Sequence, residues 1–454
     1  MTSQLKPHLQ APVTSHDDLR GYLLRGARPR EEWGIGVEME KLVLDDATGE
    51  AASFDRIEEL LRHLEGIGDW RGVRENERLV ALQGPSSSIT LEPGGQLELS
   101  GELCDDLHCC RRGYEAYIRE IVATGETLDL RFCGLGTQPF TALEQIGWLP
   151  KSRYGIMGPY MLKTGDMGQR MMKQTAGVQV NLDFSDEADA LEKMRLGMAL
   201  TPLLYALFAN SPLLEDRPTG WLSTRGEIWS RTDSDRTGLI ERLFAEAANF
   251  SDYVEYALDV PMYFIHRQGE YLDMTGERRT FRRYLDEGFA GHRAVLGDWD
   301  LHLSTLFTEV RLRPQIEVRS ADSLPPRLSL SVGALLKGLF YDQESREGAW
   351  ALLGHLSREE RQELIRQSHR LGLRTPLGDE TLREYALAVL ALARAGLERQ
   401  GCRDAEGRDE AIFLDELHEI AESGVTLAER LLARWQGTRD DKLQVLREHC
   451  DFSA

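Results

Sequence analysis

The sequence predicts an α+β fold, in which an antiparallel sheet is backed by helices and followed by a helical C-terminal region. Up to about residue 340, short segments of alternating polar and apolar residues are separated by Gly and Pro and interleaved with helical patterns. Beyond that point the apolar spacing is helical. We therefore expect a sheet-containing region over residues 1–340, with residues 341–454 packed on it as part of one continuous structural unit.

Three helices can be placed from their patterns. Residues 103–128 carry an apolar stripe that includes Leu107, Ile118 and Ile121. Residues 186–210 read as a long helix that ends at Asn210-Ser-Pro212 and that Pro202 should kink. Ser357-Arg-Glu-Glu360 has the form of a capping box, so a helix is expected to begin there.

Alternation along residues 34–44 predicts a strand with two different faces. Ile35, Val37 and Met39 lie on one face, and Glu38 and Glu40 lie on the other. The two glutamate Cα atoms would be roughly 6.5–7 Å apart. At that spacing both carboxylates can serve one metal ion or two adjacent ions.

The same design recurs in residues 91–100, 177–184 and 309–319, and a Pro93-Gly-Gly95 bend lies beside Glu92. If these faces line one cavity, carboxylates, amides and arginines would surround magnesium-bound nucleotide phosphates. The alternative is a half-exposed sheet with a solvated polar face. The polar positions are Gln96, Glu98, Ser100, Gln179, Asn181, Asp183, Glu309, Arg311, Arg313, Glu317 and Arg319.

The composition excludes several classes of function. The chain has 454 residues, 54 Lys+Arg against 75 Asp+Glu, and a net charge of -21. This excess of acid gives no general attraction to nucleic acids or to anionic membranes. The apolar runs are far shorter than the roughly 20 residues of a membrane span. The first thirty residues lack the apolar core of a secretion signal, so we expect a cytoplasmic protein.

The cysteines are expected to be reduced thiols. A local cluster of Cys104, His108, Cys109 and Cys110 lacks the second paired-cysteine motif of common zinc sites, so ordinary thiols are the favoured interpretation. A disulfide among Cys104, Cys109, Cys110 and Cys133 stays an alternative.

Familiar nucleotide and hydrolase motifs are missing from the sequence. There is no Walker loop, no Gly-x-Gly-x-x-Gly that opens a helix, no His-Glu-x-x-His and no Gly-x-Ser-x-Gly. A bound nucleotide would therefore be held in another way.

Several strings together resemble the glutamate–cysteine ligase (γ-glutamylcysteine synthetase) family of plants and proteobacteria. This family is part of the carboxylate–amine ligases with a glutamine synthetase-like fold. The resemblance runs in order through roughly residues 20 to 435. It is carried by Gly-Val-Glu-Met-Glu-Lys at 36–41, Leu-Glu-Pro-Gly-Gly-Gln-Leu-Glu-Leu-Ser at 91–100, Val-Gln-Val-Asn-Leu-Asp-Phe at 178–184, Leu-Phe-Ala-Asn-Ser-Pro at 207–212 and Ile-Glu-Val-Arg-Ser-Ala-Asp at 316–322.

The resemblance implies a cupped antiparallel sheet and a ligase reaction. Glutamate's γ-carboxylate would take a phosphoryl group from ATP, and the amine of cysteine would then displace phosphate to give γ-glutamylcysteine. ATP is the implied co-substrate, with Mg²⁺ at two or more sites and Mn²⁺ as a substitute. The implied partners are these small molecules, with no nucleic acid and no membrane, and the expected state is a monomer or homodimer.

The resemblance also assigns roles to residues. Arg319 and Glu317 would act in catalysis, and Arg225, Tyr263 and Trp229 would bind substrate. Asn181, Arg319, Lys151 and Arg153 would bind the nucleotide. The implied metal ligands are Glu38, Glu40, Glu92, Glu98, Gln179 and Glu317.

One stretch departs from the family pattern. After Ala321-Asp322 the family has a Gly-Gly-Pro-Trp-like segment whose indole helps form the cysteine pocket, whereas this chain reads Ser323-Leu-Pro-Pro. Two alternatives therefore stay open: a γ-glutamyl ligase that uses a different amine, and a non-catalytic binding protein on the same fold.

Overall fold

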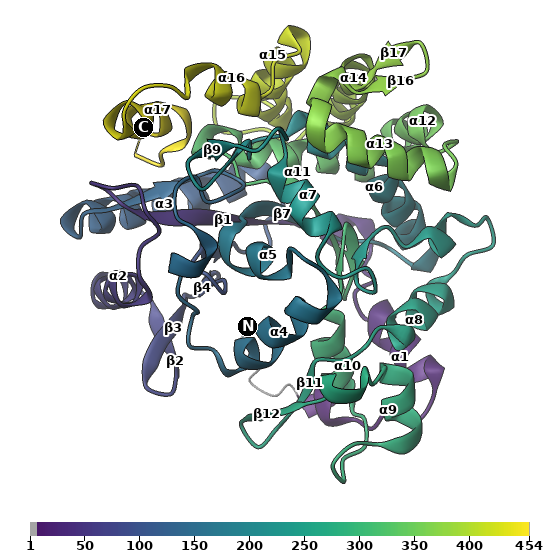
Figure 1. The fold of residues 1–454 in the computed structure, drawn as a ribbon. Coiled ribbons are helices and arrows are strands. Elements are labelled where there is room, and N and C mark those ends of the chain that lie inside the picture. The colour runs from purple at the N-terminus through teal and green to yellow at the C-terminus, as the bar shows by residue number, and fades with distance from the viewer. Residues whose placement is uncertain (1–6, 454) are drawn as a thin grey trace.

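The computed structural model describes residues 7–453, and a large sheet lies at its centre (Figure 1). The strand order is β14-β15-β7-β1-β5-β4-β3-β2, with β6 added beside β1, and the neighbouring strands run antiparallel. The predicted α+β fold is confirmed. The strands are β1 (Ile35–Asp45), β2 (Arg71–Glu75), β3 (Arg78–Gln83), β4 (Ser88–Leu91), β5 (Leu97–Ser100), β6 (Leu130–Cys133), β7 (Gly177–Leu182), β14 (Val310–Leu312) and β15 (Ile316–Asp322).

Strand β1 organises the sheet because it pairs with three other strands. Its first half lies between β7 and β5, and its second half pairs with β6. The register places Glu40 opposite Glu98 and Glu38 opposite Gln179. Directly opposed residues of an antiparallel pair point to the same face, so these polar side chains share one side of the sheet.

The other face of the sheet is apolar and is covered by helices. Helices α11 (Pro326–Phe340), α6 (Glu187–Leu207) and α3 (Leu107–Thr127) pack against it. Ile35 and Val37 are buried there, and each such side chain contributes about 1.5–3 kcal/mol relative to exposure. Lys41 is the polar exception on this face: its Nζ donates to Met39 O at 3.0 Å and to Tyr117 Oη at 3.0 Å.

Three helix predictions can be compared with the structure. Helix α3 begins at Leu107 rather than at 103, because the side chain of Asp106 accepts from Cys109 N and caps it. Helix α6 runs through Pro202 to Leu207. The capping box at Ser357 is confirmed at the start of α13.

The remaining elements surround this core. In Figure 1, α14–α17 lie along the top of the molecule and α8–α10 lie at the lower right. The helices are α1 (His16–Leu24), α2 (Phe54–Ile67), α4 (Ser152–Thr164), α5 (Gly168–Gln174), α7 (Thr224–Ser230), α8 (Phe250–Asp259), α9 (Phe281–Glu287), α10 (Leu296–Leu303), α12 (Gln343–Leu353), α13 (Arg358–Leu371), α14 (Leu382–Gln400), α15 (Asp415–Ser423), α16 (Leu427–Arg434) and α17 (Arg439–Cys450). The short strands are β8 (Leu213–Leu214), β9 (Arg217–Pro218), β10 (Thr237–Gly238), β11 (Phe264–Arg267), β12 (Glu270–Asp273), β13 (Phe307–Thr308), β16 (Pro376–Leu377) and β17 (Glu380–Thr381).

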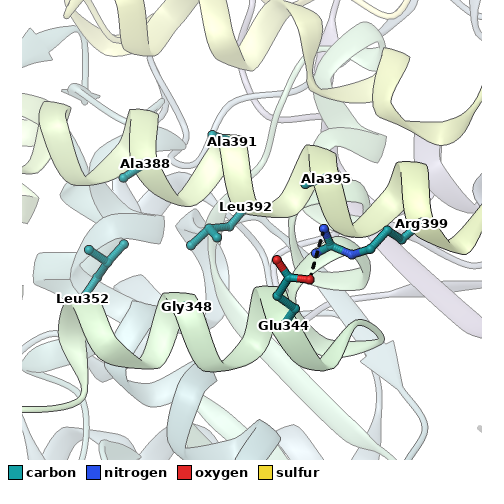
Figure 2. Close-up of a pocket in the computed structure, with 8 residues that line it drawn as sticks. All are labelled: Glu344, Gly348, Leu352, Ala388, Ala391, Leu392, Ala395 and Arg399. Carbon is teal, nitrogen blue, oxygen red and sulfur yellow. Dashed lines mark ion pairs between the residues drawn. The ribbon is translucent and has the colours of Figure 1, made fainter.

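Beyond residue 340 the chain is mainly helical, as predicted, while the proposed division at residue 340 stays a prediction. Helices α12 and α14 leave a surface groove of about 460 Å³ between them (Figure 2). Ala388, Ala391 and Leu392 line it from α14, and a Glu344–Arg399 ion pair of 3.6 Å lies at one end. None of the helices within residues 7–453 combines the length and apolar character of a membrane span.

The last helix is joined to the edge of the sheet. Gly134 N donates to Cys450 O at 2.8 Å, and Phe452 N donates to Phe132 O at 3.1 Å. The Sγ atoms of Cys133 and Cys450 lie 3.0 Å apart in a buried apolar cluster. The residues after α17 thus extend the β6 edge.

A buried ion pair connects the helical region with the sheet region. Lys337 on α11 donates to both carboxylate oxygens of Glu410 at 2.7 and 2.6 Å, and Glu410 also accepts from Leu107 N at 2.6 Å. Glu410 is fully buried. Removal of one partner of such a pair leaves an uncompensated charge in the interior.

We therefore expect Glu410→Ala to lower the free energy of unfolding by about 3–5 kcal/mol. Urea unfolding followed by circular dichroism would measure this. The matched control is Glu416→Ala, which breaks a much more exposed pair with Arg327 and should change stability by less than about 1 kcal/mol. Equal effects of the two substitutions would contradict a structural role for the buried pair.

Candidate active site

Four carboxylates meet on the polar face of the sheet without an ion-pair partner among the described residues. Glu40 accepts from Gln179 Nε2 at 2.8 Å and from Gly177 N at 2.6 Å. Glu38 accepts from Asn181 Nδ2 at 3.0 Å. The other two members are Glu92 and Glu98, and Glu98 accepts hydrogen bonds from Thr90 Oγ1 and Ser100 Oγ.

Burial and repulsion from neighbouring carboxylates make it costly to ionise Glu38, Glu40 and Glu92. Burial, reinforced by Glu98 and Glu317, raises the pKa of Glu38 to about 8. Burial, reinforced by Glu92 and Glu98, raises the pKa of Glu40 to about 8. The pKa of Glu92 is raised for the same two reasons. The site therefore favours a bound positive charge.

Glu92 comes from a turn rather than from a strand. The segment expected as one strand over 91–100 is a hairpin, in which β4 ends at Leu91 and β5 begins at Leu97. Gly94 lies so close to α5 that a Cβ would come 2.3 Å from Lys173 O. Gly95 has a φ of 89°, which favours glycine. The Pro93–Gly95 bend was predicted, and it brings Glu92 toward Glu98.

Glu317 differs from the other predicted metal ligands because it is already paired with arginines. Arg311 binds it with two donors, at 2.8 Å from Nε and 2.9 Å from Nη2, and Arg319 Nη1 lies 2.6 Å from it. Burial acts to raise the pKa of Glu317, but the two guanidinium groups outweigh it and lower this pKa to about 2. Arg319 also donates to Gln179 Oε1. This geometry favours a role for Glu317 in positioning Arg319.

Lys151 and Arg153 stand beside Glu92 at the start of α4. Lys151 Nζ donates to Leu91 O at 2.8 Å, and Arg153 donates to Tyr154 Oη at 3.0 Å. Burial, helped by Arg153, lowers the pKa of Lys151 to about 8. Both cations act on the Glu92 carboxylate electrostatically, so the predicted nucleotide-binding pair lies next to the acidic face.

A small cavity of about 10 Å³ connects Arg225 and Trp229 on α7 with Arg319 on β15. Ser223 caps α7, and Arg225 Nη2 donates to Arg319 O at 2.9 Å. The Nε and Nη1 atoms of Arg225 are buried and find no hydrogen-bond acceptor within residues 7–453. The guanidinium group thus has two donors left for a ligand.

Glu309 and Tyr205 line the same cavity and were not assigned a role from the sequence. Glu309 accepts from Tyr205 Oη at 3.0 Å and from Ser320 Oγ at 2.7 Å. The alternation of Glu309 with Arg311 was visible in the sequence. Tyr205 lies within the apolar pattern of α6, and only the packing of α6 on β14 and β15 brings it to the cavity.

Tyr263 is buried away from these contacts. Its ring packs edge-on against Tyr160 at 5.1 Å, and the Arg236 guanidinium lies 4.0 Å from its centroid. Its hydroxyl group donates to Met161 Sδ at 3.8 Å. The contacts described for Tyr263 include none of the acidic residues, and its substrate-binding role stays a prediction.

The carboxylates of the acidic face suit divalent cations that are also coordinated by a bound ligand. The predicted carboxylates do not form a compact cage: the one group in the described part of the chain whose His, Cys, Asp or Glu ligand atoms lie within 4.8 Å of one another is elsewhere. Magnesium usually keeps waters and binds through one or two carboxylates plus substrate phosphates. A wide acidic face with unneutralised charge is consistent with that mode.

An acidic sheet face bordered by Arg319, Lys151 and Arg153 is an arrangement that suits divalent cations together with phosphate or carboxylate groups. The model of glutamate-cysteine ligase family 2 matches residues 34–449. The chain therefore belongs to this family, and the predicted resemblance is confirmed.

Curated relatives agree with this assignment, and a solved structure has a similar fold. Chloroplastic glutamate–cysteine ligase B of Oryza sativa subsp. japonica is 40% identical over 96% of this chain and 87% of its own length. The chloroplastic enzyme of Arabidopsis thaliana is 41% identical over 94% of this chain and 80% of its own length. The glutamate–cysteine ligase of Francisella tularensis, solved with AMP, has a similar fold, with a TM-score of 0.53 at 14% identity over 92% of this chain and 88% of its own.

These relatives correct one prediction. The polar N-terminal residues were interpreted as typical of a cytoplasmic protein, whereas the rice, mustard and Arabidopsis relatives are named as chloroplastic enzymes. The cytoplasmic assignment is therefore wrong. The prediction fails because the composition of the first residues shows only which targeting signals they resemble. It does not determine the compartment.

The raised pKa of Glu38 predicts a pH dependence of stability. The carboxyl group ionises near 4.5 when unfolded and at about 8 when folded. Between these values the folded state holds a proton that the unfolded state has lost, so metal-free stability falls as pH rises. We expect Glu38→Gln to remove part of this fall, because glutamine does not ionise.

Urea unfolding with a chelator, from pH 5 to pH 9, would measure this effect. Magnesium should restore stability at high pH in the natural protein and restore less in Glu38→Gln. Glu31→Gln, at an exposed position, is the control and should follow the natural protein. A pH profile of Glu38→Gln identical to that of the natural protein would contradict the predicted repulsion.

Proposed function

We propose that this chain uses ATP and divalent cations to join the γ-carboxylate of glutamate to the amine of cysteine. The curated relatives are glutamate–cysteine ligases and the family is a ligase family, so the chain is an enzyme of this class. The observation that carries the detailed proposal is that a site for cations lies next to a site for an anion. The acidic face, which has no ion-pair partner among the described residues, lies beside Arg225, whose buried Nε and Nη1 donors have no acceptor there.

In the proposed reaction, a γ-carboxylate oxygen of glutamate attacks the γ-phosphorus of ATP, and ADP leaves. The cysteine nitrogen then attacks the resulting acyl phosphate carbon, loses a proton, and displaces phosphate. Divalent cations, when bound, neutralise the phosphate charges. Glu38, Glu40, Glu92 and Glu98 would hold them, and Gln179 is better suited to orienting Glu40, to which it already donates a hydrogen bond.

Arg319 is proposed to contact the transferring phosphoryl group. Its guanidinium group is held by Glu317 and by Gln179, which leaves it little freedom to reorient. A donor fixed before the reaction stabilises developing charge without reorganisation. Glu317 thereby acts through Arg319, and Arg311 keeps Glu317 ionised. Asn181, Lys151 and Arg153 are proposed to orient the nucleotide.

The Arg225 guanidinium group, which borders the small cavity, is proposed to bind the α-carboxylate of glutamate. Its free Nε and Nη1 donors suit a carboxylate, which accepts two parallel hydrogen bonds from a guanidinium group. The ring centroids of Trp229 and Phe307 lie 5.7 Å apart. The Cζ atoms of Arg225 and Arg319 each lie 5.6 Å from the Trp229 ring centroid. Glu309 at the same cavity would attract an α-ammonium group.

The segment Ser323-Leu-Pro-Pro, which differs from the family pattern, is expected to lie near the amine substrate. Ser323 Oγ donates to Glu40 O at 2.6 Å, and Pro326 begins α11. This segment is held against the backbone of β1, the strand that carries the acidic face. Relatives at 40% identity favour cysteine as the amine substrate. Because the expected indole is missing, the identity of the amine is the part of the proposal that the assay tests directly.

The test is ADP release by the purified protein with ATP, magnesium and glutamate, comparing cysteine with other amino acids and amines. We expect ADP release that depends on cysteine and a product with the mass of γ-glutamylcysteine. Release only with another amine would retain the chemistry and change the proposed substrate. Absence of release with every amine would overturn the proposal.

We further expect Arg225→Ala to raise the KM for glutamate by about 10- to 100-fold, which corresponds to the loss of a charged hydrogen-bond pair. The KM for ATP should change little. Steady-state kinetics with each substrate varied would measure both values. Arg231→Ala, in the exposed pair with Asp166 at the end of the same helix, is the control and should leave both constants unchanged.

A further inference from the structure

The segment between β5 and α3 brings cysteines and a carboxylate to one point. Glu102, Cys104 and Cys109 each present a ligand atom, and these atoms lie within 4.8 Å of one another. Cys109 Sγ lies 3.7 Å from Glu102 Oε1. The Cys104 thiol also interacts by hydrogen bonding with the thiols of Cys109 and Cys110. Two sulfur atoms and one carboxylate therefore share a single small volume, and the Cys110 thiol beside them donates to Ile35 O at 3.7 Å.

The backbone holds these donors in place. Cys104 exchanges two hydrogen bonds with Ile35, at 2.7 and 2.9 Å, and Cys109 lies in the first turn of α3, where Asp106 accepts from its amide group. Gly34 approaches so closely that a Cβ would lie 2.9 Å from Cys104 O. The positions are thus fixed by a strand on one side and by a capped helix on the other.

The spacing and the donor types suit a tetrahedral thiophilic ion. With zinc–sulfur distances of about 2.3 Å, neighbouring ligand atoms of a tetrahedral site are about 3.8 Å apart. Cys104 is buried, Cys109 and Cys110 are partly buried, and Glu102 is exposed, so an ion could enter from solvent beside the carboxylate. Thiolates select zinc-like cations over magnesium, which separates this cluster from the acidic face.

We propose that Glu102, Cys104 and Cys109 bind one thiophilic divalent cation, for which Zn²⁺ is the reference ion, with the fourth position open to solvent. Each coordinating thiol loses its proton to solvent, and no oxidation state changes. His108 is not part of the proposed site, because its ring packs on Phe413 at 5.4 Å. This cluster has no second paired-cysteine motif and instead combines Cys104 and Cys109 with the carboxylate of Glu102.

The acid–base behaviour of the cluster is consistent with this proposal. Burial and the adjacent Cys104 raise the pKa of Cys109 to about 12. Hydrogen bonding to Cys110, together with burial, raises the pKa of Cys104 further. Because each coordinating thiol must lose its proton, affinity should increase with pH.

A bound ion would fasten the strand that carries the acidic face. Ile35, which pairs with Cys104, begins β1 three residues before Glu38. Ser100, at the end of β5, lies opposite Glu38. The ion would link the start of β1 to the connection between β5 and α3, so it should stabilise the folded chain.

The test is titration of the reduced, full-length protein with Co²⁺ and Zn²⁺ in excess magnesium, with a competing chelator to set the affinity. We expect one Co²⁺ per chain with a sulfur-to-cobalt charge-transfer band, displacement by Zn²⁺, and a higher melting temperature with Zn²⁺. Cys104→Ser and Cys109→Ser should each weaken binding by about tenfold or more. Cys402→Ser, outside the cluster, should bind as the natural protein does.

Two results would overturn the proposal. One is the absence of a charge-transfer band in protein whose thiols are all reduced. The other is equal Zn²⁺ affinity in the natural protein and in Cys109→Ser, which alters a partly exposed side chain and leaves the buried Cys104 in place. In either case, free thiols would be counted before and after treatment with a chelator or a reductant. Thiols that only the reductant releases would show that the cluster forms a disulfide instead.

Discussion

Repulsion among carboxylates on one sheet face is the constraint on which the rest of this structure depends. Strand pairing brings Glu38, Glu40 and Glu98 together, and the turn before β5 adds Glu92. Like charges buried beside one another oppose folding unless something offsets them. The apolar face supplies the compensation, because α3, α6 and α11 bury the opposite side of the same strands. The fold thus keeps an unfavourable charge arrangement that a ligand can exploit.

Charge balance is distributed unevenly around this face. Glu317 is neutralised by Arg311 and Arg319, whereas its four neighbours are left without ion pairs. Lys41 lies on the opposite side of the sheet, where burial lowers its pKa to about 7 and the nearby Glu98 and Glu40 partly oppose that effect. The polar face therefore carries one carboxylate that is paired with two arginines and four carboxylates that have no ion-pair partner among the described residues.

Much of the fold could be predicted from period-2 alternation, because alternation assigns each side chain to a face. Alternation does not give register, so the pairing of Glu40 with Glu98 and of Glu317 with Asn181 became known only from the structure. The contact of Arg311 with Glu317 likewise depends on the register of β14 with β15, and the contact of Tyr205 with Glu309 depends on the packing of α6. The cysteine cluster is local in sequence, whereas the bridge between residues 35 and 104 that fixes Cys104 beside β1 joins residues far apart in the chain.

The attachment of the last residues to β6 has a mechanical consequence. Because Cys450 and Phe452 hydrogen bond to the β6 edge, and β6 pairs with the second half of β1, the end of the described chain bears on the strand that carries Glu38 and Glu40. Loss of residues 439–453 would expose Cys133 and its apolar neighbours and free one border of β1. Cleavage within this segment would therefore remove support from the same strand that carries the acidic face.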